Sequence, residues 1–168
     1  LPIRGKEDPI YEKLGQQARN AGAKVFWMKQ GDQIRVDGLS LRCLYDGAGT
    51  DETERNNHSL LIQASYGDFG MLLTGDMSAD GELQWLEQKD TLEKPVQILK
   101  IAHHGSGYSS TESFLKEVSP KLAVISCGEG NRYGHPHVET LERLEKEEIP
   151  WVCTRDCGAV LVGIKKRN

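Results

Sequence analysis

The sequence predicts a mixed α/β protein in which helices pack on a β-sheet, and two observations support this. In the second half of the chain, short apolar runs alternate with helical patterns. In the first half, pairs of alternating apolar segments are separated by turn residues, which is typical of hairpins. The length of 168 residues suits one domain, 1–168, and 38% hydrophobic residues are enough for one core.

The chain begins with a predicted helix over residues 8–24. Asp8 can cap it, Pro9 fits its first position, and Gly22 can end it. Residues 24–45 then read as short strands joined by the turns QGDQ and VDGL, with alternating apolar side chains.

A polar segment without periodicity, residues 47–57, is expected to be a loop. A hairpin follows, with strands at 60–64 and 71–74 around the turn YGDFG. Next come a helix at 78–88, opened by Ser78 or Asp80, and a strand entering HHGS. A helix at 110–120, capped by Ser110 or Thr111, and a strand at 121–128 follow. The chain ends with an amphipathic helix at 136–150, with Val138, Leu141 and Leu144 on one face, and a closing hairpin at 151–165.

Charge and hydropathy exclude few functions. The net charge of −4 gives no basic field typical of nucleic-acid binding, although a bound metal ion can supply positive charge locally. No run of 18 apolar residues is present, so we expect no membrane span within this segment. Leu1 is not a natural start, and we expect the segment to derive from a longer chain.

The four cysteines do not form paired CxxC motifs, so a structural zinc site is not expected. Cys153 and Cys157 flank a predicted turn and could form a disulfide, which would suit an oxidising compartment. Free thiols within strands are favoured for Cys43 and Cys127.

Four polar clusters end or follow predicted strands: RNNHS at 55–59, LLTGD at 72–76, IAHHGS at 101–106 and NRYGHPH at 131–137. Ligands of layered α/β proteins gather at the carboxyl ends of strands. We therefore expect Asp76, His103, His104 and Asn131 to approach one another.

A carboxylate combined with neutral imidazoles suits zinc, manganese or iron. Four of the five histidines lie in two of the clusters, at positions 103, 104, 135 and 137. Each cluster also has a structural interpretation: Asp76 can cap a helix, HHGS can shape a turn, and GHPH can be a solvated loop fixed by proline. Spacing alone leaves both interpretations open.

Five motifs follow one another along the chain: NNHSLLI, LLTGD, ILKIAHHGS, SPKLAVISCGEGNRYGHPH and TRDCGAVLV. Together they resemble the carboxyl-terminal half of the metallo-β-lactamase-like domain of ComEC-type competence proteins. These are multi-pass membrane proteins that take up transforming DNA. The resemblance implies an αβ/βα sandwich, of which this chain is the C-terminal portion, and a dinuclear metal site at one edge of the sheets.

The resemblance also implies roles for individual residues. Asp76 would bridge two divalent ions, zinc or manganese, and His103 or His104 would be a further ligand, with His103 ranked slightly ahead. His135 and His137 would act catalytically at the scissile phosphate or the leaving group. The substrate-binding candidates are Ser106, Asn56, Asn57 and Asn131.

One departure from the family limits this expectation. The main ligand motif of the family, His-x-His-x-Asp-His, is absent from the chain. We therefore expect the isolated segment to bind metal weakly or not at all and to be inactive. We also expect a sheet face that lacks its partner sheet, which would promote self-association.

The resemblance thus implies a domain of a membrane protein, on the outer side of the cytoplasmic membrane, that degrades the non-transported DNA strand as a metal-dependent nuclease. Its partners would be DNA and the rest of the parent protein. Two alternatives stay open: another hydrolase of the same fold, acting on a lactone, thioester or RNA, or a non-catalytic domain that binds DNA or partner subunits in a channel.

Overall fold

The computed structural model describes residues 8–47, 55–88 and 91–165, and in these ranges the chain folds around a mixed seven-stranded sheet. The strands lie side by side in sequence order: β1 (Gln33–Val36), β2 (Leu39–Tyr45), β3 (Leu61–Tyr66), β4 (Phe69–Leu73), β5 (Ile98–Lys100), β6 (Leu122–Ile125) and β7 (Trp151–Cys153). The helical elements are α1 (Pro9–Asn20), η2 (Arg55–His58), α2 (Ala79–Glu87), η3 (Ala102–Gly105), α3 (Glu112–Val118), α4 (Val138–Lys146) and α5 (Thr154–Cys157). The predicted mixed α/β fold is confirmed.

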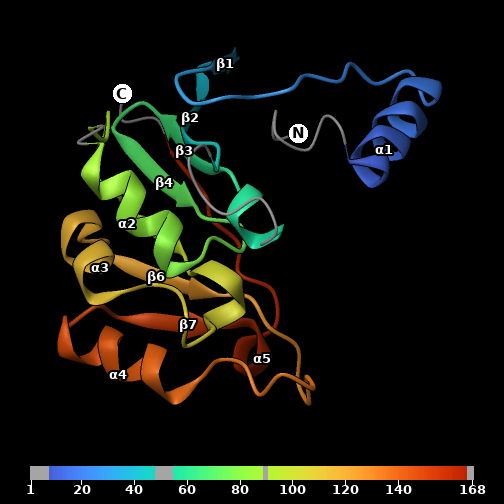
Figure 1. The fold of residues 1–168 in the computed structure, drawn as a ribbon. Helices are drawn as coiled ribbons and strands as arrows, with labels where there is room; N and C mark the ends of the chain where they lie inside the picture. Colours follow the sequence, from blue (N-terminus) through green and yellow to red (C-terminus); the bar gives the residue numbers. More distant parts are fainter. Residues whose placement is uncertain (1–7, 48–54, 89–90, 166–168) are drawn as a thin grey trace.

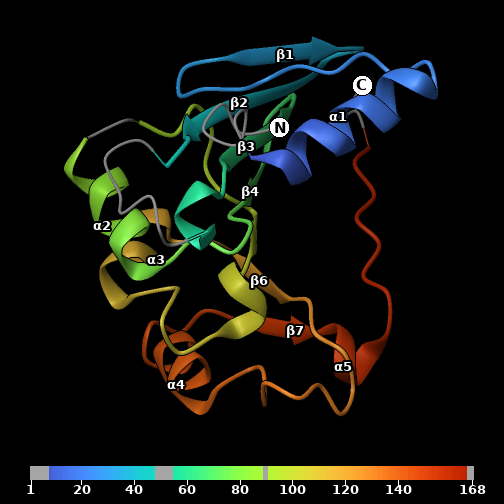
Figure 2. The ribbon, with the colours of Figure 1, turned by 45° about the vertical axis from the view of Figure 1, so that its right-hand side comes forward.

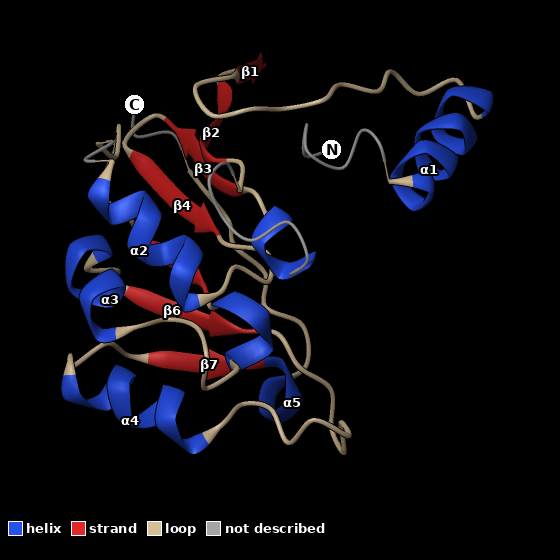
Figure 3. Ribbon diagram, viewed as in Figure 1, coloured by secondary structure: helices blue, strands red, loops and turns tan. Residues whose placement is uncertain are grey.

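The sheet changes character at β4. Strands β1 to β4 pair antiparallel, whereas β4 to β7 pair parallel. Parallel neighbours require a crossover, and α2, α3 and α4 provide the three crossovers in turn. These helices cover one face of the sheet (Figure 1; Figure 3).

The core lies between this helical layer and the sheet. Leu72, Leu99 and Ala123 are register partners on β4, β5 and β6, and all three are fully buried. Trp85 of α2 meets Phe114 of α3 edge-on, with ring centroids 5.5 Å apart. Period-two alternation in the strands therefore supplies one apolar surface, and the crossover helices cover it.

The opposite face of the sheet carries the alternate side chains. The register between neighbouring strands places four apolar residues on this face, and all four are only half-buried: Ile62, Leu73, Val124 and Val152. Residues 158–165 return from α5 along this side of the molecule in an extended course (Figure 2). A partly exposed apolar face is what the sequence led us to expect, and self-association through it stays a prediction.

Helix α1 begins as predicted. The Asp8 carboxylate accepts a hydrogen bond from the Ile10 N–H at 2.8 Å, and Pro9 occupies the first helical position. The helix lies apart from the sheet (Figure 1). None of the helices within the described ranges is both long and apolar enough to cross a bilayer.

Two predicted elements are wrong. Residues 24–29 form no strand beyond an isolated bridge residue at Met28, and the Lys29 N–H at the end of this range donates to the Asp32 carboxylate. The closing hairpin at 151–165 is also absent: β7 is followed directly by α5, and residues 158–165 pair with no strand. Of the predicted loop, residues 48–54 lie outside the described residues.

We predict that Leu99→Ala lowers the free energy of unfolding by about 2–5 kcal/mol, because Leu99 is fully buried in the centre of the sheet. Urea denaturation followed by tryptophan fluorescence measures this. Leu161→Ala is the matched control, because Leu161 is 94% exposed, and its effect should stay within about 0.5 kcal/mol. Equal effects of the two substitutions would contradict the assignment of the core.

Candidate functional site

The candidate site lies where the four parallel strands end. The carboxyl ends of β4, β5, β6 and β7 share one edge of the sheet, because all four strands point the same way. We call the loops that follow them the carboxyl edge; they comprise residues 74–76, 101–106, 126–137 and 154. Three of the four polar clusters singled out in the sequence lie in these loops, and the fourth is attached to them through Ser59.

Asp76 and His104 approach each other at the carboxyl edge. The His104 Nε2 and Asp76 Oδ1 atoms are 3.6 Å apart, and each side chain is a little under half exposed. This distance is too long for a good hydrogen bond. It is close to the separation of roughly 3.4 Å between two ligands bound tetrahedrally to one zinc ion at about 2.0–2.1 Å.

The tautomer of His104 follows from its other ring nitrogen. Nδ1 lies 2.6 Å from the Ser126 carbonyl oxygen, which can only accept, so Nδ1 carries the proton in the neutral ring. The Nε2 lone pair then faces Asp76. Fixing one imidazole nitrogen by a backbone carbonyl is the usual way in which proteins orient a histidine ligand.

The backbone of the HHG segment is unusual. His103, His104 and Gly105 have φ values of 48°, 57° and 86°, which is the left-handed region. Consecutive non-glycine residues in this region are strained and tend to occur at functional sites. Gly105 is required for packing as well, since a Cβ atom there would lie 2.7 Å from Cβ of Pro136.

His103 takes a different place from His104. Its N–H donates to the Gly75 carbonyl at 3.1 Å, and its ring meets the His135 ring edge-on with a centroid distance of 5.7 Å. The sequence left open which of the two histidines is a ligand and ranked His103 slightly ahead; both belong to the cluster, and His104 is the one whose ring nitrogen approaches the carboxylate of Asp76.

His135 forms the centre of a cluster of rings. It is 8% exposed and stacks nearly parallel to His104 at 6.3 Å and to Tyr133 at 5.7 Å. Burial, assisted by neighbouring His137 and His103, lowers the pKa of His135 below its usual value. A neutral His135 can donate one N–H to an oxygen of a bound anion.

His137 holds a loop together. Its Nδ1 accepts from the Gly107 N–H at 3.0 Å, and its Nε2 donates to the Tyr133 carbonyl at 2.9 Å. Both ring nitrogens are engaged with backbone, which fits the neutral ring with its proton on Nε2. Of the two histidines predicted to act catalytically, the geometry thus favours His135.

Two of the predicted substrate-binding residues also shape loops. The Asn131 amide donates to the carbonyls of Gly128 and His135, and its oxygen accepts from the His135 N–H. Ser106 is 2% exposed, its hydroxyl accepts from the Tyr108 N–H, and its carbonyl accepts from Thr140.

The NNHS segment lies beside the Asp76 turn. Asn56 is half-buried in η2, whereas the side chain of Asn57 lies outside the described residues. The Ser59 hydroxyl, directly after η2, accepts from the Asp76 N–H at 3.0 Å. The turn that carries Asp76 is therefore held by the segment that the sequence associated with the site.

Sequence reasoning missed Lys100, which ends β5. Its ammonium donates to the carbonyls of Gly75 and Ile101 at 3.2 and 3.1 Å. Burial lowers the pKa of Lys100, and nearby Asp76 acts in the opposite direction. A lone lysine within the apolar run ILKIA was the available signal, because a buried charge needs partners.

Sequence reasoning also missed Glu82 and Arg143, which hold the loop of residues 105–111 from two helices. Glu82 of α2 is fully buried and accepts from the Ser110 and Thr111 N–H groups. Burial raises the pKa of its carboxyl, and these hydrogen bonds and Arg143 act in the opposite direction. Arg143 of α4 donates to the carbonyls of Gly107, Ser109 and Ser110.

The residues present fit part of a metal site. Asp76 and His104 offer one carboxylate and one correctly oriented imidazole, and within the described ranges no group of three or more histidine, cysteine, aspartate or glutamate side chains is arranged to hold an ion. Two such ligands are fewer than two metal ions require. Additional ligands would have to come from elsewhere.

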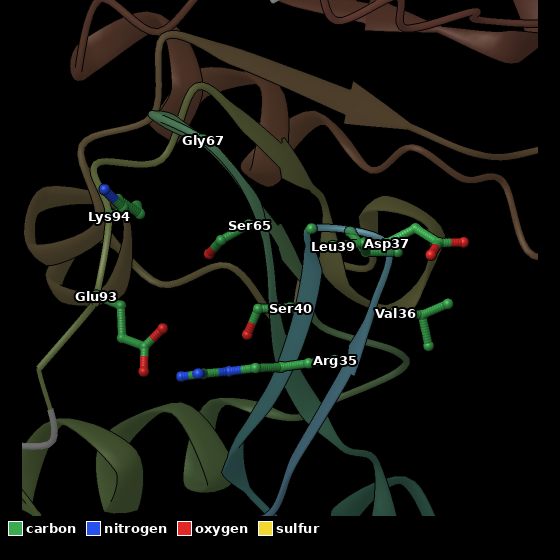
Figure 4. Close-up of a pocket in the computed structure, with 10 residues that line it drawn as sticks. Arg35, Val36, Asp37, Leu39, Ser40, Ser65, Gly67, Glu93 and Lys94 are labelled. Atoms are coloured by element: carbon green, nitrogen blue, oxygen red, sulfur yellow. The ribbon is translucent and has the colours of Figure 1, made fainter.

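A separate hollow of about 400 Å³ lies at the other end of the sheet, between the β1–β2 turn and the β3–β4 turn. Figure 4 shows its lining, in which the side chains of Arg35 and Glu93 extend toward each other. It contains no histidine or cysteine. We therefore place the candidate site at the carboxyl edge.

We predict that Arg143→Met lowers the free energy of unfolding by about 2–4 kcal/mol, because three loop carbonyls lose their charged hydrogen-bond donor. Urea denaturation measures the loss. Arg155→Met is the control, because Arg155 pairs only with the adjacent, exposed Asp156 among the ion pairs of the described residues, and its effect should stay below about 0.5 kcal/mol. Similar values for both variants would show that Arg143 does not stabilise the loop.

Comparison with known proteins gives several related chains, although no family model matches. The chain is 33% identical over 167 residues to ComE operon protein 3 of Bacillus subtilis, covering 99% of this chain and 21% of that protein. It is 38% identical over 107 residues to recombination protein 2 of Haemophilus influenzae, covering 64% of this chain and 13% of that protein. It is 35% identical over 109 residues to competence protein ComA of Neisseria gonorrhoeae, covering 65% of this chain and 16% of that protein.

The chain thus spans about a fifth of the length of ComE operon protein 3 and less of the other two. The similarity to the Bacillus protein extends over nearly the whole chain, so it includes all three motifs that meet at the carboxyl edge. These matches relate the chain to one segment of the ComEC-type competence proteins.

Proposed function

We propose that this chain is the C-terminal portion of a metallo-β-lactamase-like domain in a membrane-bound competence protein, and that it contributes to a metal-dependent nuclease that degrades the non-transported DNA strand. Its relatives include proteins named for competence and recombination, which supports a role in DNA uptake. The observation that carries the chemical part is the Asp76–His104 pair, with its donor atoms 3.6 Å apart and the His104 tautomer fixed by Ser126. In this proposal the domain lies on the outer side of the cytoplasmic membrane.

Asp76 and His104 would hold metal in the complete domain. Two divalent ions, zinc or manganese, would supply the positive charge that activates water and stabilises the leaving oxygen of a phosphodiester. The positive charge of the ions would also attract DNA locally, although the net charge of the chain is −4. The chain itself offers carboxylate and imidazole ligands that its own hydrogen bonds hold in place.

His135 would act on the substrate in this proposal. Its lowered pKa keeps the ring neutral at neutral pH, so that one ring N–H can donate to a phosphate oxygen without a fixed positive charge. Its ring stacks with the rings of His104 and of Tyr133, which would help to hold its orientation. Lys100 would act as a positioning residue, because it binds the carbonyl of Gly75 next to Asp76.

We predict that Asp76→Asn in the complete protein lowers cleavage of single-stranded DNA by about 100-fold or more, because the amide is a poor metal ligand. A fluorescent oligonucleotide assay with Mn²⁺ and with Zn²⁺ measures this. Asp80→Asn is the control, since Asp80 is an exposed carboxylate in the first turn of α2, and it should cleave as the wild type does. Unchanged cleavage by Asp76→Asn would refute the proposal, and a wild type that neither binds metal nor cleaves would favour the non-catalytic channel domain.

We further predict that His104→Asn weakens metal binding by the complete protein by at least about 10–100-fold, the loss that follows when a residue orienting a metal ligand is removed, whereas His103→Asn has a much smaller effect. Asparagine is chosen for both because it tolerates the left-handed backbone of these positions. Competition with a chromophoric chelator gives the affinities. A larger loss in His103→Asn would show that His103 is the ligand, as the sequence ranking suggested.

A further inference from the structure

Two cysteines far apart in the sequence lie together beside the carboxyl edge. The Sγ atoms of Cys127 and Cys153 are 3.3 Å apart, and both residues are reduced. The pair anticipated from the sequence, Cys153 and Cys157, is not the one that meets: Cys157 directs its Sγ to the carbonyl oxygen of Cys153 at 3.1 Å. A helical turn separates these two residues where the sequence predicted a hairpin turn.

The approach of Cys127 to Cys153 is set by the backbone. Strands β6 and β7 are parallel, with Ile125 and Cys153 as register partners. The Thr154 hydroxyl then accepts from the Cys127 N–H at 3.0 Å and donates to the Cys127 carbonyl at 2.9 Å. The two sulfur atoms are thereby held next to each other, and they have to approach only to about 2.0 Å to form a covalent bond.

We propose that Cys127 and Cys153 form an intrachain disulfide when the protein meets an oxidising thiol–disulfide pair. Cys127 attacks a small disulfide, because it is half-buried whereas Cys153 is 2% exposed, and one thiol leaves. Cys153 then attacks the Cys127 sulfur of the mixed disulfide and releases the second thiol. The protein loses two electrons and two protons, and the small disulfide is reduced to two thiols.

The surroundings of Cys127 determine how fast the disulfide forms. Burial, and the adjacent Cys153, raise the pKa of Cys127 to about 11, so little thiolate is present at neutral pH. Formation is therefore slow with a small disulfide alone and faster with a thiol–disulfide oxidoreductase.

The bond would link two segments of the site. Cys127 begins the loop that carries Asn131, His135 and His137, and Ser126 beside it orients His104. Cys153 ends β7, a three-residue strand at the edge of the sheet. A disulfide between these two residues, 26 positions apart, would keep β7 paired with β6 and fix the start of the loop.

The test oxidises the 168-residue chain with oxidised glutathione and analyses it by mass spectrometry without reduction. Trypsin cuts after Arg132 and Arg155, so Cys127, Cys153 and Cys157 fall on three different peptides: 122–132, 147–155 and 156–165. We expect a linked species of peptides 122–132 and 147–155, an intact mass lower by about 2 Da, and a Tm higher by about 5–12 °C.

Cys157→Ser is the matched control and should keep both the linked peptides and the rise in Tm. Cys127→Ser should lose both, and its Tm under reducing conditions shows whether it folds. Linkage of peptide 156–165 to 147–155, or reduced peptides after prolonged oxidation in the presence of an oxidoreductase, would overturn the proposal.

Discussion

The parallel pairing of β4, β5, β6 and β7 is the constraint on which the candidate site depends. Antiparallel neighbours would send successive loops to opposite edges of the sheet, whereas four parallel strands deliver the residues after each strand to one edge. Asp76 and His104, 28 positions apart in the chain, become neighbours for this reason. The same geometry brings Cys127 to Cys153, so that both the Asp76–His104 pair and the thiol pair result from the strand order rather than from local sequence.

The loops of the carboxyl edge are ordered by buried polar contacts. Glu82 and Arg143 bind backbone groups of residues 107–111 from α2 and α4, the Ser109 hydroxyl donates to the Met77 carbonyl, and Thr140 donates to Ser106. Each contact satisfies a backbone or hydroxyl group that would otherwise be buried without a partner. The crossover helices thus have two roles, since their apolar sides cover the sheet and their charged residues hold the loop that follows His104.

Local signals predicted most of the elements, whereas the orientation of side chains at the site depends on contacts between distant segments. Asp8 caps its helix as predicted, and Ser78 and Thr111 are the caps among the alternatives that the sequence left open, because a cap needs only residues within one turn. At the end of the strand expected at 24–29, the Lys29 N–H donates to the Asp32 carboxylate three positions on, so this segment runs into a turn. At the site, the cluster of histidines was foreseeable from strand ends, but the orientation of His104 by the Ser126 carbonyl was not, since backbone acceptors leave no mark in a sequence.

The contacts around Asp76 bear on how strongly the proposed metal site would bind an ion. The turn that carries Asp76 is held by Ser59, by Lys100 and by the His103 N–H, and His104 is held by Ser126. These contacts are all within the chain, and they hold the two donor atoms 3.6 Å apart. If the isolated chain binds metal with low affinity, the cause would be the small number of ligands and not their misplacement, because the ligands present need little reorganisation. Each further ligand supplied by the rest of the protein would complete a geometry that is already set, which makes the affinity of the complete domain the informative quantity.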